Sequence, residues 1–194
     1  MTGPHVIPFL PAYIPVEVCA TVGMDPAQPD GVAKCMAAVQ ADVRDDGVSA
    51  PRADVEGLRQ VVSDARQSGV DLKVVVLPAN PAIDTPLRDI ATEVGAANPG
   101  ATVLALSPSF AGTYSPTIDR VTLEAGQDVA KSGNPVLSAK NFVGEISTPD
   151  FPWTALAIVL TVGVAAAAVL TRVLQVRSKR IAGSGASSAP VVEP

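Results

Sequence analysis

A chain of 194 residues has room for one domain of ordinary size with short appendages. Aromatic residues make up only 4% of it, so the core must be built mainly from short aliphatic side chains, as in α/β proteins. Residues 1–150 carry a net charge of −8 and residues 151–194 carry +3. We expect no nucleic-acid partner, because an acidic domain repels phosphate groups.

The N-terminal segment, residues 1–30, is rich in proline and shows no sustained periodicity, which predicts an extended and irregular structure. Its apolar stretch from Val6 to Val16 contains three prolines and is preceded by no lysine or arginine, unlike the hydrophobic region of a secretory signal. We therefore interpret this stretch as part of the mature protein, with a degenerate signal peptide as the alternative.

Two amphipathic helices are predicted next, over residues 32–46 and about 54–67, because apolar residues recur there at every third or fourth position. Residues 47–51 contain glycine and proline and are predicted to be a break between the two helices. Gly69 follows the second helix at a position that suits a C-cap. These helices begin a domain that we place at residues 31–148.

Two buried strands separated by a helix follow. Residues 72–77 and 102–106 are almost continuously apolar, as expected for strands that are covered on both faces of a parallel sheet. Between them, a helix over residues 86–97 is expected to begin after Thr85 as N-cap, with Pro86 at its first position. This order predicts a right-handed crossover and an α/β domain with a small, mostly parallel sheet flanked by helices.

A long surface loop is predicted over residues 107–134, with a short helix from about Thr122, before a last helix over residues 135–146. Long loops in compact domains are often binding elements. Phe110 and Tyr114 lie in this loop among glycine and serine residues. They either form an exposed recognition surface or fold back onto the core, and the sequence leaves both alternatives open.

Residues with catalytic chemistry are scarce. The single histidine, His5, lies in the irregular N-terminal segment, so no Ser-His or Cys-His arrangement is predicted, and no cofactor is expected. Three carboxylates that follow the predicted strands are a weaker candidate for binding Mg²⁺ or Ca²⁺: Asp84, Asp89 and Asp119. Their spacing matches no defined metal loop, and Asp89 has the alternative of pairing with Arg88.

The clearest feature is a run of 21 uncharged residues at 151–171. A helix of this length spans the hydrocarbon core of a bilayer, about 30 Å. A buried core helix is the alternative, but core helices seldom run so long without a polar face. We therefore predict one C-terminal transmembrane helix at residues 151–172.

Charges around this helix predict its orientation. Basic residues follow it at once, whereas the last charge before it is Asp150. The positive-inside rule places residues 173–194 in the cytoplasm as a basic, disordered tail, and residues 31–148 outside the cytoplasm. The residues expected to hold the anchor at the two membrane surfaces are Trp153, Arg172, Arg177, Lys179 and Arg180.

Placement outside the cytoplasm bears on the two cysteines of the chain. A disulfide between Cys19 and Cys35 would stabilise the domain by about 3 kcal/mol. Two free thiols buried as small hydrophobic side chains are the alternative, and the sequence leaves both open.

The chain resembles a family of actinobacterial single-pass membrane proteins whose best-known members are septal proteins of corynebacteria and mycobacteria. The resemblance covers nearly the whole chain and rests on TPLRDIA at residues 85–91, SPSFAGTYS at 107–115 and FPWTALAIVL at 151–160. It implies an extracellular α/β domain similar to receiver or TPM-type domains. A phosphate-accepting receiver has an aspartate at a strand end where this chain has Leu77 and Pro78, so phosphotransfer is not expected.

The same resemblance implies a function. It points to a non-enzymatic regulator at the division septum that activates a secreted NlpC-type peptidoglycan D,L-endopeptidase for cell separation. The implied contact is between the coiled-coil region of the hydrolase and residues 107–134. The partner-binding residues expected there are Ser109, Phe110, Tyr114, Ile118, Arg120 and Glu124. The alternative is a weak metal-dependent phosphatase of the TPM-like type that uses the three carboxylates named above.

Overall fold

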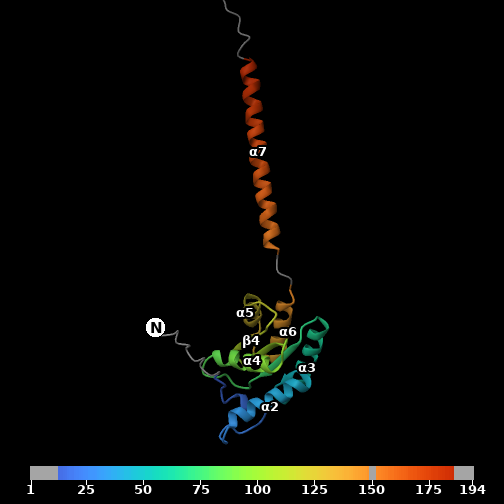
Figure 1. Ribbon diagram of the computed structural model, residues 1–194, viewed down its shortest axis with the longest axis vertical. Helices are drawn as coiled ribbons and strands as arrows, with labels where there is room; N and C mark the ends of the chain where they lie inside the picture. Colours follow the sequence, from blue (N-terminus) through green and yellow to red (C-terminus); the bar gives the residue numbers. More distant parts are fainter. Residues whose placement is uncertain (1–12, 149–151, 186–194) are drawn as a thin grey trace, which may run out of the picture. The chain divides into compact units, whose positions relative to one another are not determined.

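The computed structural model describes residues 13–148 and 152–185, the last five of these by their backbone only. The chain divides after Thr148 into two units, a domain with a β-sheet and a long helix, α7 (Trp153–Gly185) (Figure 1). Each unit is described by itself below.

The domain is built around a four-stranded sheet with the order β1-β2-β3-β4. The strands are β1 (Val48–Ser49), β2 (Leu72–Val76), β3 (Thr102–Leu106) and β4 (Ala111–Tyr114). The first three strands are parallel, and β4 returns antiparallel to β3. The predicted fold class, α/β with a small, mostly parallel sheet flanked by helices, is confirmed.

Both edge strands differ from the sequence prediction. β1 lies inside residues 47–51, which were predicted to be a break, and β4 lies inside the predicted surface loop. A strand of two residues is too short to show a period, and the Ala-Gly-Thr-Tyr sequence of β4 lacks apolar alternation. The hairpin turn before β4 is closed by the Ser107 amide, which donates to the carbonyl of Phe110 at 2.9 Å.

In the described part of the domain, five helices cover the sheet in two layers, and all of them were predicted with small shifts in their limits. They are α2 (Gly31–Asp46), α3 (Arg52–Gln67), α4 (Thr85–Ala97), α5 (Arg120–Val129) and α6 (Pro135–Ile146). The pair α2 and α4 lies on one face, and α3, α5 and α6 lie on the other. The predicted cap of α4 is wrong by one residue, since the helix begins at Thr85 and Asp84 precedes it.

Two hydrophobic clusters, one on each face of the sheet, make up the core. On the α2–α4 face, Val75 and Val103 pack with Leu87 and Ile90. On the other face, Leu104 and other strand residues pack with Leu58 of α3 and with Phe142 of α6. Both faces of the central strands are therefore apolar, which explains their unbroken hydrophobic sequences.

The N-terminal segment is part of this core, contrary to the prediction that it is irregular. Residues 18–21 form a short helix, α1 (Val18–Thr21), and Val18 and Cys19 are fully buried. The Thr21 hydroxyl donates to the carbonyl of Val76 at 3.0 Å, which ties α1 to the end of β2. Cys19 and Cys35 form a disulfide, with their Cα atoms 4.8 Å apart, so the open question about the two thiols is answered. His5 and the proposed signal-like stretch lie largely outside the described residues.

The long helix α7 contains the predicted transmembrane segment. Residues 153–180 include a window with a mean hydropathy of 2.3, and none of that window is buried. The prediction of a disordered tail from residue 173 is wrong as far as Gly185, because the helix continues to that point. Residues 173–182 are mostly good helix formers and contain neither glycine nor proline, so no local signal stops the helix at the end of the apolar run. Residues 186–194 lie outside the described part.

Candidate functional site

A groove runs along the β4 edge of the sheet, between α4, β4 and α5. Its volume is about 260 Å³. We call it the β4 groove and define it by its lining residues: Arg88, Thr92, Thr113, Tyr114, Ser115, Ile118, Arg120, Leu123, Glu124 and Gln127. A smaller hollow of about 150 Å³ shares Arg88 and Gln127 with it and reaches Asp84 at the start of α4.

The floor of the groove depends on a close approach between β4 and α4. A Cβ atom on Gly112 would lie 2.4 Å from the backbone carbonyl carbon of Leu87, so only glycine fits there. A Cβ atom on Gly95 would lie 2.1 Å from Cδ1 of the Tyr114 ring. These two glycines let the strand and the ring of Tyr114 pack directly against the helix.

Hydrogen bonds between side chains hold the far wall in place. Thr113 donates from its hydroxyl to Oε1 of Gln127 at 3.3 Å, which joins β4 to α5. The hydroxyls of Ser115 and Thr102 lie 2.9 Å apart, and Ser115 also accepts from the amide of Ile118 at 3.2 Å. The connection from β4 to α5 is therefore an ordered turn, and it positions Ile118 in the groove.

The start of α5 is fixed by a side-chain cap. Asp119 accepts hydrogen bonds from the Thr122 amide at 3.0 Å and from the Thr122 hydroxyl at 2.9 Å. These bonds favour the ionised carboxylate and lower the pKa of Asp119 below its ordinary value. Capping orders the first turn of α5, which carries Arg120 into the groove.

The rim of the groove carries two arginines and one glutamate. Arg120 donates from Nε to Oε1 of Glu124 at 2.7 Å, one turn along α5. Arg88 on α4 is exposed, and within the described chain its guanidinium makes no hydrogen bond or ion pair. The rim therefore presents an exposed guanidinium on its α4 side. Val121, just outside the groove on α5, is 77% exposed and adds an apolar side chain.

Four of the six predicted partner-binding residues line this groove, namely Tyr114, Ile118, Arg120 and Glu124. The other two do not. Ser109 lies in the β3–β4 turn, where its amide donates to Oδ1 of Asn80 at 2.9 Å. Phe110 packs against the core on the α2–α4 face.

The prediction about the two aromatic rings is decided by their burial. Phe110 and Tyr114 are both half-buried and pack against the same hydrophobic cluster. The alternative of an exposed aromatic surface is therefore wrong, and the rings fold back onto the core. Tyr114 keeps one side at the groove, whereas Phe110 anchors the hairpin turn.

The three carboxylates of the metal-binding alternative serve separate local roles. Asp119 caps α5, Asp84 precedes α4, and Asp89 accepts from the amide of Tyr13 at 3.0 Å instead of pairing with Arg88. No group of three or more His, Cys, Asp or Glu side chains suited to a metal ion occurs within residues 13–148 and 152–180. The phosphatase alternative therefore lacks a clustered set of oxygen donors in the described chain.

Sequence reasoning missed the α4 side of the groove. Arg88 and Thr92 lie four residues apart and thus on one face of α4, and Gln127 faces them from α5. A polar stripe opposite the buried Leu87 and Ile90 was visible in the sequence, but nothing there indicated that β4 and α5 would border it.

Comparison with known proteins agrees with the presence of α7. The sequence profile of a family described as "Membrane protein Rv1476" matches residues 13–188. The chain belongs to this family. A member of the Rv1476 family from Mycobacterium tuberculosis (strain ATCC 25618 / H37Rv), itself described as "Membrane protein Rv1476", is 54% identical over 187 residues. The match covers 95% of this chain and 92% of that relative. No solved structure matches the chain.

Membership of the Rv1476 family confirms part of the sequence-based resemblance. The protein is a membrane protein with a mycobacterial relative, and α7 is its candidate membrane-spanning helix. The orientation of α7, the septal location and the activation of a hydrolase stay predictions.

Proposed function

We propose that this member of the Rv1476 family is a non-enzymatic, membrane-anchored regulator that binds a secreted NlpC-type peptidoglycan D,L-endopeptidase through the β4 groove. The observation that supports this proposal is the groove itself, with an arginine on its rim that has no partner in the described chain and half-buried apolar side chains on its floor. α7 would anchor the domain on the outer side of the cell membrane, with its basic end in the cytoplasm.

The groove suits a helix of the partner as its occupant. A coiled-coil helix presents apolar residues in a stripe and charged residues of both signs beside that stripe. Tyr114 and Ile118 would receive apolar side chains, and Arg88 would receive a carboxylate, as in helix-in-groove recognition. The coiled-coil region of the endopeptidase is the partner segment with these properties.

Activation would follow from preferential binding. An autoinhibited hydrolase exchanges between a closed state and an open state, and a ligand of the open state shifts the population toward it. If the coiled coil is accessible to the groove only when it has left the active site, binding stabilises the active enzyme. The regulator needs no catalytic group of its own for this effect, and the septum is the place where we expect it to act.

The test measures the rate at which the autoinhibited endopeptidase releases stem peptides from purified peptidoglycan. The full-length protein is added in lipid nanodiscs. We expect the wild-type protein to raise the rate and Arg88→Glu to remove most of that increase. The matched control is Arg66→Glu, which reverses a charge at the far end of α3. Absence of stimulation by folded wild-type protein, or equal stimulation by both variants, would contradict the proposal.

A further inference from the structure

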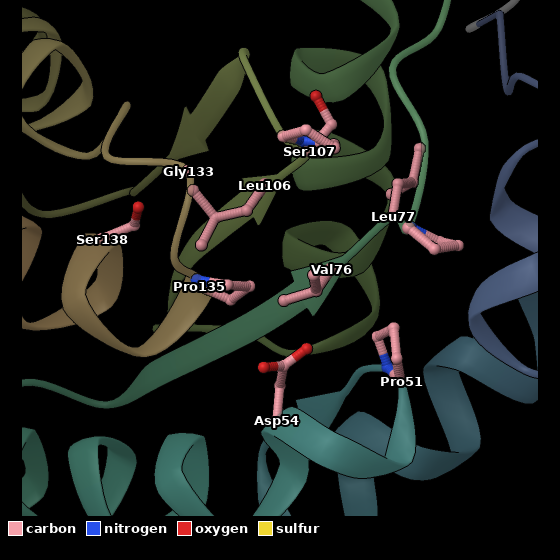
Figure 2. A pocket seen from close by; sticks show the side chains of 11 residues that line it. Pro51, Asp54, Val76, Leu77, Leu106, Ser107, Gly133, Pro135 and Ser138 are labelled. Atoms are coloured by element: carbon pink, nitrogen blue, oxygen red, sulfur yellow. The ribbon is translucent and has the colours of Figure 1, made fainter.

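A second pocket lies at the carboxyl ends of the parallel strands, on the α3–α6 side of the sheet (Figure 2). It has a volume of about 310 Å³ and lies between the ends of β2 and β3, the start of α3 and the start of α6. The carboxyl ends of the strands are where open α/β sheets bind their ligands. This pocket shares no lining residue with the β4 groove, and the inference drawn from it is independent of the proposed function.

The walls of the pocket are apolar and rigid. Val76 and Leu106 at the strand ends are buried, and four of the lining residues are prolines: Pro51, Pro78, Pro108 and Pro135. Proline fixes φ and has no N–H group, so these loops offer few donors to an anion. The phosphate-binding arrangement of backbone amides found at many such strand ends is thus disfavoured here.

The polar side chains that line the pocket differ in whether they have a hydrogen-bond partner in the described part of the chain. The Ser107 hydroxyl donates to Oδ1 of Asn80 at 2.8 Å, and the Ser138 and Ser132 hydroxyls lie 2.7 Å apart. Asp54 is half-buried, and in the described part of the chain its carboxylate has no hydrogen-bond or ion-pair partner. Figure 2 shows that the Asp54 side chain extends from the start of α3 toward the strand end that carries Val76.

We propose that this pocket binds a primary ammonium group carried on an unbranched aliphatic stem. The Asp54 carboxylate would accept charge-assisted hydrogen bonds from the ammonium group, while the prolines and Val76 contact the methylene groups. A Mg²⁺ or Ca²⁺ ion is a poor fit, because one carboxylate falls short of the oxygen ligands that these ions require. Such a ligand occurs as a small free amine or as a lysine side chain.

The experiment records ¹H–¹⁵N spectra of the full-length protein in nanodiscs during titration with n-butylammonium chloride at constant ionic strength. We expect saturable shifts of backbone amides around the pocket, such as those of Leu77 and Gly133, with a dissociation constant in about the millimolar range. Asp54→Asn should weaken binding about tenfold or more, whereas Asp45→Asn on the exposed surface of α2 should leave it unchanged.

Two further probes keep the test decisive. n-Butanol has the same stem without the charge, so it should bind wild-type protein about tenfold more weakly, and this comparison does not depend on the folding of any variant. Nα-acetyl-lysine N-methylamide separates the two sources, since its binding supports a lysine side chain and binding of n-butylammonium alone supports a free amine. Equal binding of n-butanol, unaltered binding by folded Asp54→Asn, or no saturable shift with either amine would overturn the proposal.

Discussion

The two edges of the sheet are each flanked by two helices, yet they use their charged residues in different ways. β1 lies between α2 and α3, and β4 lies between α4 and α5. An edge strand exposes unpaired backbone groups and requires protection. At the β1 edge Asp46 and Arg59 pair with each other. At the β4 edge, in the described part of the chain, Arg88 has no such partner beside the groove.

At the β1 edge several polar groups are paired internally. Asp46 accepts from the amide of Val48 at 2.9 Å and from Nε of Arg59 at 2.6 Å. The Ser49 hydroxyl donates to Asp42 at 2.9 Å. These bonds therefore use the polar groups nearest to β1 within the domain.

At the β4 edge some polar side chains are paired within the domain and one charged side chain is not. Thr113 and Ser115 are used internally, but the guanidinium of Arg88 is unpaired within the described chain. If the charged side chains were paired at both edges, we would expect these side chains to contribute only to the stability of the domain. The contrast is the reason why we propose the β4 edge, and not the β1 edge, as the surface that binds a partner protein.

The largest expected effect on stability concerns α2. This helix covers the β1 edge, and the disulfide ties it to α1. Replacing both cysteines, Cys19→Ala with Cys35→Ala, should lower the free energy of unfolding by about 3 kcal/mol, because the unfolded chain loses a cross-link. Urea unfolding of the full-length protein, followed by circular dichroism, measures this change. Because the disulfide lies away from the β4 groove, the NMR resonances of the backbone amides that line this groove should keep their positions in the double variant. Displacement of most of these resonances would contradict the comparison of the two edges.

The next effect concerns the close contact beneath the β4 groove. Gly112→Ala should destabilise the protein by about 2–3 kcal/mol, because the new Cβ meets the backbone of α4 and the two elements must separate. The control is Gly144→Ala on the exposed side of α6, where a Cβ meets nothing within 4 Å. That variant should be neutral or more stable by up to about 1 kcal/mol. Urea midpoints that are the same for both variants would refute the tight packing of β4.

A smaller effect concerns the pH dependence contributed by Asp119 at the start of α5. Its pKa in the folded protein is below the ordinary value of 3.8, because Thr122 donates two hydrogen bonds to it. The stabilisation is therefore complete above the unfolded pKa and is lost as the pH falls through the folded pKa. Asp119→Asn should be less stable than wild type at neutral pH, and this difference should shrink with acidification below about pH 4. A difference that stays constant with pH would show that the carboxylate charge has no role.

The smallest effect concerns the exposed ion pair of the β1 edge. Asp46 raises the pKa of Arg59 through a hydrogen bond and its charge, but surface pairs of this kind contribute little to stability. Arg59→Met should shift the urea midpoint less than Gly112→Ala does, and it should leave stimulation of the endopeptidase unchanged. If Arg59→Met lowered stimulation of the endopeptidase as much as Arg88→Glu does, the two edges of the sheet would not differ in partner binding, and the comparison would be wrong.

The sequence predicted the elements that have a clear period and missed those that depend on distant contacts. Helices such as α6 and the strands β2 and β3 carry their burial pattern in consecutive residues, so their limits were predicted almost correctly. β1 and β4 are edge strands whose identity depends on pairing with β2 and β3, which local sequence does not show. α1 was missed for the same reason, since its burial depends on contacts with α2 and β2.

The candidate site could be predicted only in part. Tyr114, Ile118, Arg120 and Glu124 share a segment of the chain, so interpreting that segment as a binding element was enough to select them. Arg88 belongs to a helix more than twenty residues earlier and became part of the site only through the return of β4 along α4. Asp54 was not predicted at all, because the pocket around it is assembled from four separate loops and helix ends.

The most direct test of the central claim places a photo-crosslinking residue, p-benzoylphenylalanine, at each edge of the sheet in the full-length protein. Thr92 reports on the β4 groove, and Asp45 at the end of α2 reports on the β1 edge. After irradiation with the intact endopeptidase, we expect a crosslink from position 92 to the coiled-coil region and none from position 45. Crosslinking from position 45 that equals that from position 92, or activation of the hydrolase without any crosslink from the groove, would contradict the account.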